Sequence, residues 1–127
     1  MAPLASFGGN ETFTALLKAK TAAYTVLVSE SGVIFTNRGA TASVTFTLPA
    51  VTNLPIGFNV TFYGLSAYGF AVASGGSADN IVVQNDATAD SITFTTTSRI
   101  IGAACKVVWD GTAWLSFIYV GATAAYA

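Results

Sequence analysis

Apolar and polar residues alternate with a period of two along much of this chain. In the segment 43–48, Val44, Phe46 and Leu48 fall on one face, and Ser and Thr residues fall on the other. The segment 58–62 repeats this pattern. Successive side chains of a β-strand point to opposite faces, so such alternation is typical of a strand with one buried face. The pattern predicts an all-β protein.

The alternating segments and the turn residues between them predict about eight or nine short strands. These strands are expected at residues 24–28, 33–37, 42–48, 58–63, 70–73, 81–84, 91–95, 101–109 and 113–120. The Asp110-Gly111 step between two apolar segments predicts a β-hairpin, because Gly adopts positive φ without strain. Residues 37–39 predict a second turn, and residues 75–77 a loop. Many short strands with frequent turns favour a compact antiparallel β-sandwich or small barrel.

The first residues of the chain differ from the rest. We expect an N-terminal arm of residues 1–23, followed by a β domain of residues 24–127. Phe13, Leu16 and Leu17 have roughly helical spacing. Because a single turn of helix is marginally stable on its own, the arm is expected to be extended, with at most a short helix.

The last expected strand is apolar on both faces. Trp114, Ile118 and Val120 fall on one face, and Leu115, Phe117 and Tyr119 fall on the other. A strand with one face in water would alternate, so both faces are expected to be covered. One cover is the core of the domain, and the other is expected to be a neighbouring subunit. The small apolar C-terminal segment, which contains Tyr126, is expected to make contacts of the same kind.

Very few residues are charged. The chain has five Lys or Arg and six Asp or Glu among 127 residues, which is 9% charged, whereas an ordinary soluble domain has about 25%. Such a chain is expected either to enter a membrane or to be covered by other protein. A spanning helix needs about 20 apolar residues in succession, and every apolar run here is interrupted sooner. We therefore expect no membrane association, and the lack of clustered Lys and Arg disfavours nucleic-acid binding.

The sequence offers little for catalysis. General acid–base chemistry, zinc binding and nucleophilic triads depend largely on His, and the chain has none. The single cysteine, Cys105, lies within the apolar segment 100–108 and is expected to be a buried, inert thiol. We expect neither an enzyme nor a cofactor. The N-terminal residues carry no basic leader with an apolar stretch, so synthesis in the cytoplasm is expected.

The sequence also contains candidates for a calcium site and for a sugar-binding site. The segment 79–90 collects three of the six acids together with several amides, which is compatible with a calcium site, although Asn and Asp are also ordinary turn formers. Tyr63, Tyr68, Trp109 and Trp114 are candidates for a sugar-stacking platform. For these aromatic residues, packing in the core or in an interface is the favoured alternative.

Several segments, taken in order, resemble a known kind of domain. They are residues 24–26 (YTV), 31–37 (SGVIFTN), 39–41 (GAT) and 44–49 (VTFTLP). This succession resembles the opening of a small β domain of tailed-phage virions, found in capsid decoration (cement) proteins and in head or tail fibres. The hairpin WDGTAW at residues 109–114 resembles the closing strands of such domains.

The resemblance implies a homotrimeric virion protein without catalytic residues. A fibre protein would normally add a long repetitive shaft, so we expect a decoration protein on the surface of a phage head, made in the host cytoplasm and bound to the major capsid protein. The expected capsid contacts are Phe7, Phe13, Leu16, Leu17, Lys18 and Lys20. The expected subunit contacts are Leu115, Phe117, Tyr119 and Tyr126. The alternative is a receptor- or carbohydrate-binding module of a phage fibre or adhesin that uses loop tips around Tyr68 and residues 79–90.

Overall fold

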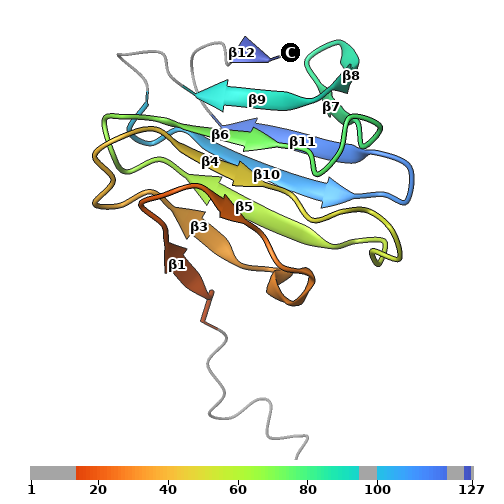
Figure 1. Cartoon of the computed structure of the whole chain (residues 1–127), viewed down its shortest axis with the longest axis horizontal. Helices are drawn as coiled ribbons and strands as arrows, with labels where there is room; N and C mark the ends of the chain where they lie inside the picture. Colours follow the sequence, from red (N-terminus) through yellow and green to blue (C-terminus); the bar gives the residue numbers. More distant parts are fainter. Residues whose placement is uncertain (1–13, 95–99, 120–124, 127) are drawn as a thin grey trace, which may run out of the picture.

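The regular secondary structure of the described residues is almost entirely β-strand (Figure 1). The structure is a computed structural model that describes residues 14–94, 100–119 and 125–126. In that part, the only helical element is a short 3-10 turn, Val28–Glu30. The prediction of an all-β protein is confirmed.

The strands form two sheets. The large sheet contains, in spatial order, β1 (Leu17–Ala19), β3 (Ile34–Thr36), β5 (Asn59–Tyr63), β10 (Ala104–Trp109), β11 (Trp114–Tyr119), β7 (Ile81–Val83) and β8 (Asp86–Ala89). The small sheet contains, in spatial order, β12 (Ala125–Tyr126), β9 (Ser91–Phe94), β6 (Phe70–Ala73), β4 (Val44–Thr47) and β2 (Tyr24–Thr25).

The first six strands alternate between the two sheets as the chain advances. β1, β3 and β5 are parallel neighbours in the large sheet, and β2, β4 and β6 are parallel neighbours in the small sheet. Parallel neighbours need a long crossover connection, and here each crossover is the visit to the opposite sheet. The later strands β9, β10, β11 and β12 add antiparallel pairs. β7 and β11 are a further parallel pair. The prediction of antiparallel sheets is therefore wrong, since both sheets contain parallel pairs and a period of two does not encode strand direction.

Phenylalanine rings from both sheets meet in the core. Phe46 of the small sheet packs against both Phe35 and Phe62 of the large sheet, with its ring centroid 5.7 Å and 4.9 Å from theirs, respectively, and Phe35 and Phe62 stack on each other at 5.8 Å. All three side chains are fully buried. The buried positions fall at every second residue of β4 and β5, so the alternation predicted for these strands is confirmed.

The strands β1, β8 and β12 were not predicted from the sequence. Leu17 belongs to β1, which pairs with β3, so this part of the expected arm is extended, and the short helix suggested by the spacing of Leu16 and Leu17 is not formed there; Phe13 lies outside the described residues. β7 and β8 form a hairpin within the segment 79–90. Its turn residues Gln84 and Asn85 both have positive φ, 41° and 71°, as a two-residue type I′ hairpin turn requires.

The hairpin predicted at Asp110 is confirmed. It joins β10 and β11, and Trp109 pairs with Trp114. The backbone N–H groups of Thr112 and Ala113 each donate to Asp110 Oδ1 at 2.7 Å. These hydrogen bonds, that from Ala113 above all, hold the pKa of Asp110 below its ordinary value.

Candidate protein-interaction face

The outer face of the large sheet carries the side chains of β11 that were predicted to meet a neighbouring subunit. The register places Leu115 beside Val108 and Phe117 beside Lys106 on this face. Phe117 is 46% exposed and Tyr119 is 58% exposed, whereas Trp114 is fully buried on the inner face. The predicted assignment of the two faces is confirmed for these residues. Their role in an interface stays a prediction, and Val120 lies outside the described residues.

The same apolar face continues across the sheet to β1. Leu17 pairs with Ile34, and Ile34 pairs with Thr61 of β5, beyond which lies β10. Leu17 and Tyr63 are exposed. No Asp or Glu occurs in β1, β3, β5, β10 or β11. The outer face of these five strands thus combines apolar side chains with the neutral polar side chains of Thr36, Asn59 and Thr61 and with the Lys106 ammonium, and it carries no carboxylate.

A pocket of about 470 Å³ opens on this face near β1. Its lining consists of Leu17, Ala19, Ile34, Thr36, Arg38, Tyr63 and Leu65. We call it the Arg38 pocket, because Arg38 is the one charged residue in that lining. The sequence analysis identified Leu17 as a contact residue, but it did not identify Ile34, Arg38 or Leu65.

The expected capsid-contact residues have different environments. Leu16 and Leu17 are exposed and available for contact. Lys18 instead forms an ion pair with Glu30, with Nζ and Oε2 2.6 Å apart. The Nζ atom of Lys20 lies 3.9 Å from the ring centroid of Tyr24. Both ammonium groups therefore have partners within the fold, while Phe7 and Phe13 lie outside the residues that the structure describes.

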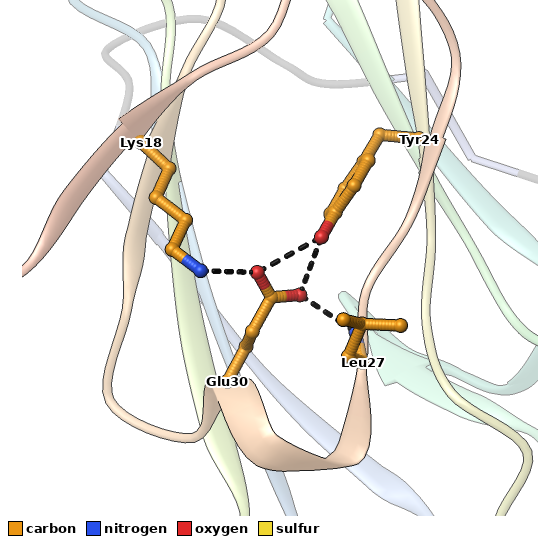
Figure 2. A network of polar contacts seen from close by, with 4 residues as sticks. All are labelled: Lys18, Tyr24, Leu27 and Glu30. Carbon is orange, nitrogen blue, oxygen red and sulfur yellow. Dashed lines mark hydrogen bonds and ion pairs between the residues drawn. The ribbon is translucent and has the colours of Figure 1, made fainter.

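The carboxylate of Glu30 organises the first turn of the chain (Figure 2). Only 3% of this residue is exposed. Besides the ion pair with Lys18, it accepts hydrogen bonds from the Tyr24 hydroxyl, at 2.8 Å and 2.9 Å, and from the Leu27 N–H at 2.7 Å. The carboxylate thereby links β1, β2 and the 3-10 turn. It was not found from the sequence, because its partners come from separate elements.

These contacts shift the pKa values of the Glu30 carboxyl group and the Tyr24 hydroxyl group. Burial by itself would raise the pKa of Glu30, but the hydrogen bonds from Lys18, Leu27 and Tyr24 outweigh burial and hold it below its ordinary value. The pKa of Tyr24 is raised, first by burial and then by its hydrogen bond to the Glu30 carboxylate. In the folded protein, Glu30 is therefore ionised and Tyr24 neutral at neutral pH.

Stability is expected to fall in acid partly because of Glu30. A carboxyl group with a lowered pKa in the folded state adds stability above its unfolded pKa, and this stability is lost as the pH falls through the folded pKa. The loss should therefore begin near the ordinary value of 4.5 and continue below it. Urea unfolding between about pH 7 and pH 3 should give a flatter pH profile for Glu30→Gln than for the wild type. All other carboxyl groups are common to both proteins, so identical profiles would contradict this role of Glu30.

The side chain of Asn37 ties two loops together beneath the Arg38 pocket. It is fully buried. Its Nδ2 donates to the carbonyl of Gly69 at 3.0 Å, and its Oδ1 accepts from the N–H groups of Leu65 at 2.7 Å and Ser66 at 2.9 Å. The predicted turn at 37–39 is confirmed by the Ala40 N–H bond to the Asn37 carbonyl. Because Asn is also a common turn residue, these distant contacts could not be predicted from its position in the sequence.

The other candidate sites receive little support from the geometry. Cys105 is fully buried, as expected, and burial raises the pKa of its thiol to about 12. Among the described residues, no group of three His, Cys, Asp or Glu side chains is placed to hold a metal ion. Trp109 and Trp114 are buried in the core, which excludes them from a sugar-stacking platform, whereas Tyr63 and Tyr68 are exposed.

Within the ranges that the structure covers, no helix has the length and apolar character needed to cross a membrane. No model of a known protein family matches the sequence, and a search of curated proteins found no significantly similar chain.

Proposed function

We propose that the protein is a virion structural protein, built as a β-sandwich, that decorates the icosahedral head of a tailed phage and clamps adjacent capsomers. The single observation that carries this proposal is the apolar, carboxylate-free outer face of β1, β3, β5, β10 and β11. In a chain with 9% charged residues, an extended face of this kind fits a contact with other protein. The resemblance of residues 24–49 and 109–114 to phage decoration domains supports the choice of a phage head.

The proposed action is mechanical rather than chemical. A protein that binds only the assembled shell stabilises that shell by mass action. In a homotrimer, three linked contacts with the shell also act together, so avidity exceeds the affinity of one contact. No catalytic residue and no cofactor are required.

The proposed contacts serve two partners. Leu115, Phe117 and Tyr119 on the large sheet would face a neighbouring subunit, and so would Tyr126, which lies in β12 at the edge of the small sheet. Phe7, Phe13, Leu16 and Leu17 would face the major capsid protein. Lys18 and Lys20 are given a structural role instead, because Glu30 and Tyr24 already contact them.

Light scattering and co-sedimentation test the proposal. The wild type is expected to have three times the 13.0 kDa mass of one chain and to pellet with bare phage heads. Phe117→Ser should shift the mass towards that of the monomer, because a serine in the contact removes apolar area from it. Val28→Ser, which changes an exposed apolar side chain outside the proposed face, is the matched control and should remain trimeric.

The capsid contact is tested separately with a chain that lacks residues 1–13. This variant is expected to remain a trimer but to stay in the supernatant when it is mixed with heads. A monomeric wild type would contradict the trimer. Failure of the full chain to pellet with heads would contradict the decoration role.

One observation favours a second candidate, a carbohydrate-binding module. Tyr68 is exposed, and its loop is held by a hydrogen bond from its own N–H to Ser66 Oγ at 3.2 Å, so the ring is available on an ordered loop. A glycan array would distinguish the two functions, because specific binding that is lost in Tyr68→Ala would favour this alternative.

A further inference from the structure

The Arg38 pocket combines an apolar lining with a single cation. Leu17, Ile34 and Leu65 supply much of the apolar wall. The structure gives the Arg38 guanidinium no carboxylate partner within residues 14–94 and 100–119. A guanidinium beside apolar surface is suited to a group that brings both an apolar body and a carboxylate.

Such a group is present on the chain itself, at the tip formed by residues 55–57 and 110–112, which we call the Ile56 tip. Ile56 is 76% exposed, more than any other large apolar side chain that the structure describes. A Cβ atom added at Gly111 would lie 3.1 Å from Ile56 Cδ1, so the isoleucine side chain packs on the hairpin that begins at Asp110. The tip therefore presents an apolar side chain beside an ionised carboxylate.

The Ile56 tip is held in place by backbone hydrogen bonds. The N–H of Gly57 donates to the Trp109 carbonyl at 2.7 Å, and the N–H of Phe58 donates to the Pro55 carbonyl at 3.1 Å. Gly57 has a φ of 95°, the left-handed conformation that the third residue of a type II turn requires. A preformed tip loses little conformational freedom on binding.

The tip and the pocket lie at opposite ends of β5, a strand that can be followed in Figure 1. The tip ends at Gly57, two residues before Asn59, the first residue of the strand, whereas the pocket is lined by Tyr63, its last residue. A straight strand separates them, so a chain cannot place its own tip in its own pocket. A tip that fills this pocket would therefore come from a second copy.

We propose that the Ile56 tip of one copy occupies the Arg38 pocket of the next, with the Asp110 carboxylate against the Arg38 guanidinium. This inference rests on the self-association in the proposed function. It adds the tip and the pocket to the subunit contact of Leu115, Phe117 and Tyr119, and it assigns Leu17, which lines the pocket, to a second copy instead of the capsid protein. The contact is head to tail, because each copy uses a different surface towards each neighbour. Contacts of this type close into rings, such as a trimer, when the rotation between copies allows it.

Single variants measured by light scattering test each surface. Arg38→Glu disables the pocket and Ile56→Ser disables the tip, and both changes are at exposed positions. Each variant is expected to show a threefold lower mass than the wild type, with an unchanged circular dichroism spectrum. Asp110→Asn should weaken association while keeping the side-chain oxygen that accepts from Thr112 and Ala113. Val28→Ser is again the control and should match the wild type.

Mixing the variants tests the head-to-tail geometry. Arg38→Glu retains an intact tip and Ile56→Ser retains an intact pocket, so an equimolar mixture should form a dimer although neither variant associates alone. Absence of that dimer would overturn the proposal. If both single variants remain trimeric like the wild type, this contact is wrong while the proposed assembly stands; a monomeric wild type would overturn the self-association itself.

Discussion

Replacing Phe46 by alanine is expected to lower the free energy of unfolding by about 3–5 kcal/mol, the usual cost of removing a buried aromatic ring. The Phe46 ring is fully buried and lies 4.9 Å from the Phe62 ring and 6.3 Å from the Phe70 ring, measured between centroids. Its removal would leave a cavity where the two sheets pack against each other. Because small domains are stable by only about 5–15 kcal/mol, this loss would be a large fraction of the total.

Urea unfolding followed by circular dichroism measures this loss, with Phe117→Ala as the matched control. The control removes the same ring from the outer face, where it is 46% exposed, and should cost roughly 1 kcal/mol or less in dilute protein. A similar loss for both variants would contradict the placement of Phe46 at the centre of the core.

Asn37→Ala is the second variant from which we expect a large loss, of about 3 kcal/mol or more. The substitution would leave the partly buried N–H of Leu65 and the buried N–H of Ser66 without their acceptor, and it would remove one donor from the Gly69 carbonyl, which still accepts from the Val44 N–H at 3.4 Å. Each unsatisfied buried group costs about 1–3 kcal/mol, and the cost is smaller where water can form a hydrogen bond with the group. The variant should also loosen the loop that carries Leu65 into the Arg38 pocket.

Asn59→Ala provides the comparison for Asn37. Its Nδ2 donates one exposed hydrogen bond, to the Gly57 carbonyl at 3.0 Å, so its removal should cost about 1 kcal/mol or less. Both variants are measured by the same urea titration. Equal losses would show that the Asn37 side chain does not hold the two loops together.

Local pattern was enough to identify most of the strands and their faces, but it did not identify how they are arranged. The alternation around Val44 and Phe46 and the two apolar faces from Trp114 onwards are properties of a single strand, and they were predicted correctly. Strand order and direction depend on which strands meet. β1 has only three residues, and it becomes a strand because β3 pairs with it, a contact that short-range spacing could not indicate.

The candidate face was predicted only in part for a similar reason. Phe117 and Tyr119 could be identified because they interrupt a local pattern. Lys18 was expected to contact the capsid as part of the N-terminal arm, but the structure pairs it with Glu30, which lies twelve residues later. Arg38 was not identified from the sequence, because the pocket that it lines is formed by strands that come together only in the folded sheet.

The winding of the first six strands also determines when the outer face of the large sheet can exist. β5 meets its parallel neighbour β3 soon after it is synthesised, but its other neighbour, β10, pairs Val107 with Val60 from a much later part of the chain. Until the β10–β11 hairpin has been made, β5 has an open edge and Phe117 and Tyr119 are absent. A nascent chain on the ribosome therefore cannot present the complete face to another copy, and on this structure assembly can follow only after the subunit has finished folding.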